Sequence, residues 1–336
     1  MEYSGIMVSV YCLTYKHAKY LNQTLDGFAK QKTNFRFEVI IHDDASNDGS
    51  KEIIYDYCNK YPDIFIPIIQ EVNQYSQKID IIRQFILPKV RGKYVAICEG
   101  DDFWTDENKL QMQVDALEYN TDCNMALHKV VEISENGIAT GFTYPSYKVN
   151  SILSSAVFID MQYNYSFQTS SFFMRSNIWK DYIKNPPLFK QLFPVGDVPL
   201  MLYFGDKGKT YYIDKAMSCY RRGVKTSYTT RTKLANSTIE KQNDLSQRFI
   251  NALISFDSYS QKKYHKFCVK KIALYMGAVA VLSGNTKIIL SKENKEYYNA
   301  LDSRHKFAIC LTRVFPLFTR KIFNVRRRIQ AKQHYC

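Results

Sequence analysis

Five carboxylates in two short clusters are the side chains of this sequence best suited to chemistry. They are Asp43 and Asp44, after the apolar run 37–41, and Glu99, Asp101 and Asp102, after the apolar run 94–98. Crowded carboxylates raise one another's pKa unless a positive charge neutralises them. Oxygen ligands suit Mg²⁺ or Mn²⁺, and Mg²⁺ commonly takes one or two carboxylates and completes its shell with water and substrate phosphates. The clusters therefore indicate a divalent cation that holds a diphosphate.

Turn formation is the alternative explanation for acidic residues that follow a strand. We assign Asp48 and Asp106 to this role, because each stands just before a segment with helical periodicity. Two adjacent acids such as Asp101 and Asp102 gain nothing from local turn chemistry, which favours a functional role for them.

The elements that must position these clusters alternate between strands and helices. Short apolar runs predict strands, and residues spaced by three and four predict helices between them. The predicted strands of the first half are 6–13, 37–41, 64–69 and 94–98. Such βαβ alternation is typical of an α/β fold with a mostly parallel sheet, in which ligands bind at the carboxyl ends of the strands. Both acidic clusters stand at that end.

The second half of the chain has a less regular pattern. Strand-like pieces are expected at 125–133, 170–174, 210–213 and 217–220, with a short helix that begins at Asp197. From about residue 232 the pattern is helical to the end, which predicts a helical C-terminal region.

Composition places the chain among folded proteins and excludes small stapled scaffolds. It has 336 residues, 46% hydrophobic and 23% charged, with eight scattered cysteines and no C-x-x-C pair. The N-terminus lacks the features of a signal peptide, and the longest weakly polar stretch, 272–283, is too short to span a bilayer. A reducing, cytoplasmic location is therefore expected.

Three sequence blocks in order resemble the nucleotide-binding half of the family 2 glycosyltransferases, which adopt the GT-A fold. They are VSVYCLTYKHAKYLNQTLDGFAKQ (8–31), FEVIIHDDASNDGS (37–50) and YVAICEGDDFWTDENKLQMQVDAL (94–117). The resemblance continues more thinly through 168–175, 196–214 and 216–222. It implies a GT-A domain over 1–230, with a nucleotide-sugar half (1–120) and an acceptor half (121–230), and a helical region over 231–336.

The resemblance also implies roles for single residues. Thr14 and Tyr15, with Asp43 and Asp44, would hold the base and ribose of the donor. Glu99-Gly100-Asp101 occupies the place of the family's Asp-x-Asp motif. Asp101 would then bind the metal directly, while Asp102 would support the loop or the donor sugar. Because Glu99 stands where the family usually has Asp, contact of Glu99 with ribose or bound water is as plausible as contact with metal.

Further along, the resemblance places Asp197 at the family's general base, which removes the proton of the attacking acceptor hydroxyl. Pure N-capping of the following Val198-Pro199 helix is the alternative. Arg221 and Arg222 are candidates for neutralising the leaving diphosphate. The family often has a histidine after this element, but Gly223 follows here. Water or arginine would then substitute, or metal dependence would be weaker.

The positive charge of the chain is concentrated at its C-terminus. Net charge is +14, and after Asp302 there are nine Lys and Arg residues and no acidic residue. Apolar residues recur at spacings of three and four from Leu311 to Ile329, interrupted by Pro316. This basic amphipathic pattern predicts peripheral contact with a membrane; a terminal helix packed on the enzyme is the alternative, and nucleic acid binding is disfavoured because no nucleic-acid module accompanies it.

Together these features predict an inverting, metal-dependent glycosyltransferase. Its donor would be a nucleotide-diphosphate sugar, a UDP-sugar in our expectation. Its acceptor would be a hydroxyl of a glycan or lipid-linked acceptor in cell-surface polysaccharide synthesis, and its cofactor Mn²⁺ or Mg²⁺. The alternatives are a nucleotidyltransferase acting on a sugar phosphate and a non-catalytic glycan or membrane adaptor.

Overall fold

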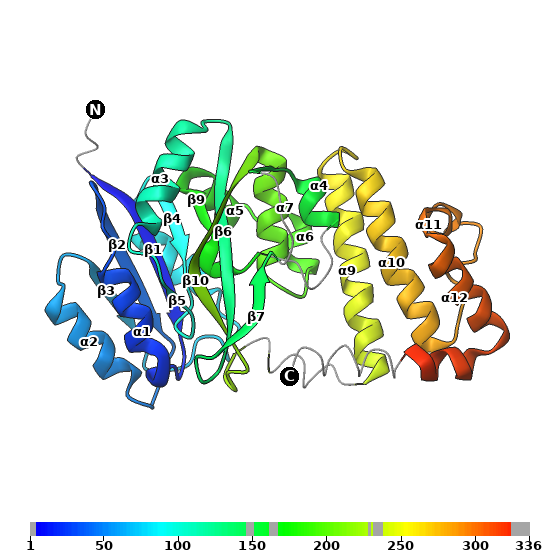
Figure 1. The fold of residues 1–336 in the computed structure, drawn as a ribbon, viewed down its shortest axis with the longest axis horizontal. Coiled ribbons are helices and arrows are strands. Elements are labelled where there is room, and N and C mark those ends of the chain that lie inside the picture. The colour runs from blue at the N-terminus through cyan, green and yellow to red at the C-terminus, as the bar shows by residue number, and fades with distance from the viewer. Residues whose placement is uncertain (1–4, 146–150, 161–166, 228–229, 231–237, 324–336) are drawn as a thin grey trace. The chain divides into compact units, whose positions relative to one another are not determined.

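The structure of the chain, a computed structural model, describes residues 5–145, 151–160, 167–227, 230 and 238–323 (Figure 1). The chain divides into two units, which are described separately. Unit 1 comprises Met1–Pro186 and Leu200–Arg231, and unit 2 comprises Pro187–Pro199 and Thr232–Cys336. The functional division predicted at residue 120 stays a prediction.

One mixed sheet forms the centre of unit 1, with its main strands in the order β3-β2-β1-β4-β9-β6-β10-β5. The strands along this path are β1 (Ile6–Thr14), β2 (Arg36–Asp43), β3 (Phe65–Ile69), β4 (Tyr94–Ile97), β5 (Phe103–Trp104), β6 (Cys123–Ser134), β9 (Phe173–Arg175) and β10 (Lys209–Arg222). In addition, β7 (Ala139–Tyr144) pairs with β6, and β8 (Ile152–Leu153) pairs with β10.

The first four strands of this order are parallel, as the βαβ pattern predicted. β1 pairs with β2 from Ile6 opposite Arg36 to Thr14 opposite Asp43, and it pairs with β4 up to Tyr11 opposite Ile97. β3 lies at the edge, where a strand that contains Pro67 is tolerated. This register brings the carboxyl ends of β1, β2 and β4 to one edge of the sheet, and with them both acidic clusters.

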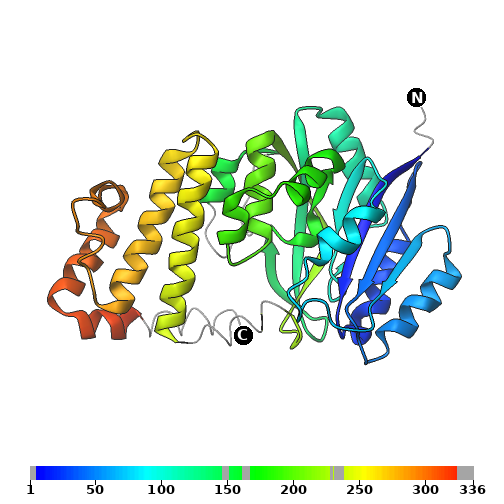
Figure 2. The same cartoon turned by 180° about the vertical axis from the view of Figure 1, so that it is seen from behind.

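Helices cover both faces of the sheet in unit 1 (Figures 1 and 2). α1 (Ala18–Ala29), α2 (Ser50–Lys60) and α3 (Lys109–Tyr119) bury their apolar stripes on one face, in a core that includes Val10, Val39 and Ala96. The Tyr11 ring is on the other side of β1 and lies 5.8 Å from the ring of Trp179 in α5 (Ser176–Lys184). Burial on both faces explains why β1 is a nearly continuous apolar run.

The remaining helical pieces of unit 1 are short. They are η1 (Ile82–Ile86), η2 (Leu87–Lys89), η3 (Thr169–Ser171), α4 (Ser155–Asp160) and the part of α7 (Asp197–Lys207) from Leu200 onward.

The two strands expected at 210–213 and 217–220 are one continuous strand, β10, which runs parallel to β6 over its length (Figure 1). Its register against β6 shifts between Ile213 and Ala216 and again before Ser218. The irregularity lies at the polar residues Asp214 and Lys215, which explains why the apolar pattern suggested a break there.

Unit 2 is helical, as predicted. Its elements are α6 (Leu188–Leu192), the first turn of α7, α9 (Ile239–Tyr259), α10 (His265–Ser283), α11 (Lys295–Ala300) and α12 (Ser303–Val314). Phe189 packs edge-on against Phe256, at 5.2 Å between ring centroids. Ala273 and Ala280 of α10 form a small core with Ile309 of α12. No helix in the described part of the chain is long and apolar enough to cross a bilayer.

Candidate active site

The loops after β1 and β2 are tied together by the first acidic cluster. Both carboxylate oxygens of Asp43 accept hydrogen bonds from Ser46, one from its backbone N–H at 2.9 Å and one from its hydroxyl at 2.5 Å. The Ser46 hydroxyl in turn accepts from the backbone N–H of Lys16 at 2.8 Å. Lys16 and Ala45 have φ angles of 58° and 62°, which non-glycine residues rarely adopt. The network therefore holds both loops in strained conformations at the carboxyl edge of the sheet.

Asp44 fixes the position of a third loop. Its backbone N–H donates to the carbonyl of Thr14 at 3.1 Å. Its carboxylate accepts from the backbone N–H groups of Gln74 at 2.7 Å and Tyr75 at 3.1 Å. The buried Asp44 thus joins the ends of β1 and β2 to the loop after β3, a structural task that accompanies its predicted role toward the donor.

Gly100 allows the second acidic loop to lie directly on the end of β1. Its N–H donates to the carbonyl of Leu13 at 3.0 Å. A Cβ at this position would lie 2.7 Å from Thr14 Oγ1 and 2.9 Å from His17 Nδ1. Both of these atoms are buried and lack a hydrogen-bond partner within the described structure. Glycine is required here by the close approach of the two loops.

Asp101 differs from the other buried acids because its carboxylate is not used to hold the protein together. It is 4% exposed. Among the described residues no group donates a hydrogen bond to this carboxylate, and its recorded partner is His17, with Nε2 at 3.9 Å from Oδ2. The Asp101 carboxylate is therefore available to an added ligand.

Asp102 is held by the strand opposite. Its Oδ1 accepts the backbone N–H of Arg221 at 2.8 Å, and its carbonyl accepts the hydroxyl of Thr24 at 2.6 Å. Burial raises the pKa of Asp102 well above its usual range, the charge of Asp101 adds to this effect, and the Arg221 N–H opposes it. Ionisation of Asp102 is therefore unfavourable in this loop, and a bound cation would offset part of that cost.

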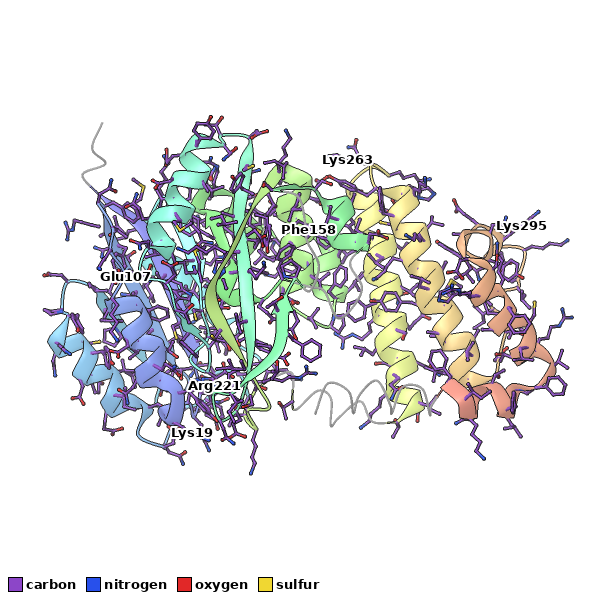
Figure 3. All side chains as sticks on the ribbon, viewed as in Figure 1. Lys19, Glu107, Phe158, Arg221, Lys263 and Lys295 are labelled. Atoms are coloured by element: carbon purple, nitrogen blue, oxygen red, sulfur yellow. The ribbon has the colours of Figure 1, made fainter. Side chains whose placement is uncertain are left out.

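The guanidinium of Arg221 locks the acidic loop in place. It donates from Nε to the carbonyl of Asp101 at 3.1 Å, from Nη1 to the carbonyl of Glu135 at 3.3 Å, and from Nη2 to Gln23 Oε1 at 2.7 Å. The group also lies 4.7 Å from the centroid of the Tyr20 ring. Figure 3 shows Arg221 at the same end of unit 1 as Lys19. These contacts make Arg221 a positioning residue for Asp101; its contact with a diphosphate stays a prediction.

Arg222 points to a different partner. Its Nη1 lies 3.0 Å from Oε2 of Glu132, a fully buried carboxylate on β6. The same Oε2 accepts the hydroxyl of Tyr144 at 2.5 Å. Burying a carboxylate is costly unless it is paired or hydrogen-bonded. The contact with Glu132 therefore gives Arg222 a structural role, and its predicted role toward a diphosphate remains untested.

The other predicted residues lie around this edge or in unit 2. Glu99 is exposed at the start of the acidic loop, and Tyr15 is half-buried with Lys16 Nζ 5.3 Å from its ring centroid. Asp197 begins α7 in unit 2, and its Oδ1 accepts the N–H of Val198 at 2.8 Å. Burial raises the pKa of Asp197 above its usual range. Its role as a base stays a prediction.

His17 was assigned no role from the sequence, although it follows Thr14 and Tyr15 by only a few residues. In the structure His17 directly precedes α1, and its imidazole lies beside the Asp101 carboxylate. The sequence signal that could have identified this residue is its position just after Thr14 and Tyr15, at the end of the first strand. The histidine that the resemblance places after Arg222 is absent, and His17 supplies an imidazole beside Asp101 from another loop.

Trp104 is a core residue of unit 1. It is buried, packs edge-on against Phe28 at 4.7 Å, and donates from Nε1 to the carbonyl of Ser170 at 3.2 Å. Asp106 accepts the N–H of Asn108 at 2.9 Å, so it forms a turn just before α3, whose N-cap is Asn108.

The carboxylates of the acidic loop suit a Mg²⁺ or Mn²⁺ ion that takes most of its ligands from the substrate. In the described ranges no group of three or more His, Cys, Asp and Glu side chains could hold a metal. Asp101 nevertheless offers an available carboxylate beside a second buried acid, and one or two protein carboxylates are what Mg²⁺ takes when phosphates complete its shell.

The chain matches the sequence model of a known family. The model described as Glycosyl transferase family 2 matches residues 9–179, just over half of the 336 residues. The match spans both acidic clusters and the strands that carry them.

Relatives match this chain over part of its length. An uncharacterized protein of Mycobacterium tuberculosis, Rv1520, is 41% identical over 132 residues, which cover 39% of this chain and 37% of that protein. A Bacillus subtilis protein, provisionally named the teichuronic acid biosynthesis glycosyltransferase TuaG, is 28% identical over 109 residues, or 32% of this chain and 41% of that protein. The matched region therefore spans well under half the length of these relatives.

A solved structure is similar over nearly the whole chain. The crystal structure of S. aureus TarS 1–349 in complex with UDP-GlcNAc has a TM-score of 0.59 and 15% identity, and covers 97% of this chain and 92% of that one. At this identity the similarity concerns the fold. It confirms the predicted GT-A architecture with C-terminal helices.

Proposed function

The chain belongs to glycosyl transferase family 2, and from this premise we propose that it transfers a sugar from a nucleotide-diphosphate donor to a hydroxyl group of an acceptor. The observation that carries the proposal is the buried Asp101 carboxylate, to which no described residue donates a hydrogen bond, beside Asp102 at the carboxyl edge of the sheet. In parallel α/β sheets this edge is where ligands bind.

We assign the donor side of the reaction to unit 1. Asp101 would hold Mn²⁺ or Mg²⁺, with His17 beside it, while Asp102 and Arg221 keep the loop in position. Thr14, Tyr15, Asp43, Asp44 and Glu99 would surround the base and ribose. When bound, the cation would supply positive charge for the diphosphate that leaves. We favour a UDP-sugar as donor, because the TarS structure that shares the fold contains UDP-GlcNAc.

The reaction is an inverting displacement in our proposal. The acceptor oxygen forms a bond to the anomeric carbon while the bond from that carbon to the diphosphate oxygen breaks, and the nucleoside diphosphate leaves with the electron pair. Asp197 would take the hydroxyl proton. Burial raises the pKa of Asp197, and a carboxylate of raised pKa is a better base.

For the acceptor we propose a chemical class and no individual compound. The name of TuaG associates a relative that matches 32% of this chain with teichuronic acid, which favours a glycan or lipid-linked acceptor in cell-surface polysaccharide synthesis. The described cysteines are all free, which agrees with a reducing, cytoplasmic compartment.

The proposal can be tested with a panel of nucleotide sugars. Each is incubated with the purified chain, once with Mn²⁺ and once without it. We expect Mn²⁺-stimulated release of nucleoside diphosphate from one donor and loss of that release in Asp101→Asn. Asp115→Asn removes an exposed carboxylate on α3 and is the matched control. Release of pyrophosphate instead would indicate nucleotidyl transfer, and unchanged activity of Asp101→Asn would refute the assigned site.

A further inference from the structure

The last described segment, 303–323, exposes its apolar side chains. It comprises α12 and a second helical piece, 316–323, which follows a break at Phe315. Six large apolar residues of this segment are between 50% and 80% exposed: Phe307, Val314, Phe315, Leu317, Phe318 and Ile322. A folded domain rarely leaves so many apolar side chains together in water without a binding partner.

The inward positions of the same segment include two hydroxyls. Thr312 and Thr319 are buried, along with Ile309. Thr312 Oγ1 donates to the carbonyl of Ala308 at 2.7 Å, and Thr319 Oγ1 donates to the carbonyl of Phe315 at 3.1 Å. Because each hydroxyl is satisfied within its own helical turn, it can face the protein at little cost. The arrangement thus turns two hydroxyl groups inward while the six large apolar side chains remain exposed.

The charges that accompany this surface are all positive. After Asp302 the chain contains no acidic residue. Within the described segment the cations are Arg304, Lys306, Arg313, Arg320 and Lys321. Lys306 donates to the carbonyl of Asn299 at 3.1 Å, and among the described residues none of the four others forms an ion pair. A partner of this surface must therefore be both apolar and anionic.

We propose that the surface formed by α12 and 316–323 docks on an anionic lipid bilayer. The apolar side chains would enter the boundary between headgroups and acyl chains, and the cations would lie at the phosphates. A second copy of this chain is the weaker candidate, because it would bring the same positive charges face to face. The proposal concerns described residues of unit 2, whereas Val325 to Ile329 of the predicted tail lie outside the described residues. It is independent of the proposed catalytic function.

Flotation of the full chain with lipid vesicles tests this inference. We expect binding to vesicles of phosphatidylcholine mixed with phosphatidylglycerol, and little binding to phosphatidylcholine alone. Each cation near an anionic surface contributes about fivefold to the partition coefficient, so Arg320→Gln with Lys321→Gln should lower it about 30-fold. Phe318→Ser should lower it at least about tenfold. Ile288→Ser is the matched control, since Ile288 is 59% exposed in the same unit.

Four outcomes would overturn the proposal. The first is equal binding of the chain to neutral and anionic vesicles, and the second is undiminished vesicle binding by Phe318→Ser and by the Arg320→Gln, Lys321→Gln variant. The third is a concentration-dependent dimer in sedimentation that Phe318→Ser abolishes. The fourth is vesicle binding that occurs only after residues 324–336 are removed. The third would identify a second copy as the occupant, and the fourth would identify the chain's own end. Binding of UDP and Mn²⁺ can be measured on the same samples, so failure here does not affect the test of the catalytic site.

Discussion

The fully buried Lys109 should make the stability of unit 1 depend on pH. Its Nζ donates to Gln113 Oε1 at 2.7 Å and lies 3.9 Å from the ring centroid of Trp104. An amide and an indole ring neutralise no charge, and burial lowers the pKa of Lys109 from 10.5 to about 7. The buried thiol of Cys98 does not supply the counter-charge, because burial raises its pKa.

The sign and size of the effect follow from proton linkage. Between pH about 7 and 10.5 the unfolded chain binds a proton at Lys109 that the folded chain does not bind, so the free energy of unfolding rises with pH. Integrated from pH about 7 to about 9, this one group contributes a rise of about 2 kcal/mol. Lys109→Met fits an apolar chain of similar length to the same site and should remove this dependence.

Urea unfolding followed by tryptophan fluorescence measures this directly, because the two tryptophans, Trp104 and Trp179, both belong to unit 1. The unfolding free energy of the parent minus that of Lys109→Met should rise by about 2 kcal/mol between the two pH values. Lys51→Met removes an exposed lysine of α2 and should show no such rise. Parallel pH profiles of parent and Lys109→Met would refute the reasoning.

Three further variants test how the acidic loop is built. Gly100→Ala would force a Cβ to within 2.7 Å of Thr14 Oγ1 and 2.9 Å of His17 Nδ1, so calorimetry should show a loss of about 1–3 kcal/mol in stability together with weaker binding of UDP and Mn²⁺. Arg221→Lys keeps the charge but loses the three-way donation of the guanidinium, and should cost about 2–4 kcal/mol in urea unfolding; a variant as stable as the parent would contradict the positioning role. His17→Leu removes a buried nitrogen that lacks a partner in the described structure, so we expect equal or greater thermal stability but at least about tenfold weaker Mn²⁺ affinity in titration calorimetry with UDP; unchanged affinity would exclude His17 from the site.

Local sequence patterns were sufficient to predict the first half of the fold. The apolar runs at 6–13, 37–41 and 94–98 correspond to β1, β2 and β4, because a parallel strand buried on both faces is continuously apolar. The strand-terminal position of the acidic clusters followed from the same periodicity. The pattern failed at β10, where Asp214 and Lys215 interrupt the apolar run but not the strand.

The amino-acid sequence by itself determined which side chains stand at the carboxyl ends of strands, since chain order and burial pattern are local properties. It could not determine which of these carboxylates hold loops together and which one is available to a ligand. Asp43, Asp44 and Asp102 accept hydrogen bonds that hold loops together, whereas no described residue donates one to the Asp101 carboxylate. Ser46 is only three residues from Asp43, but folding brings Gln74 to Asp44 and Arg221 to Asp102 from distant parts of the sequence. That division, the burial of Trp104 and the approach of His17 to Asp101 depend on contacts between separate segments, and such contacts exist only once the chain has folded.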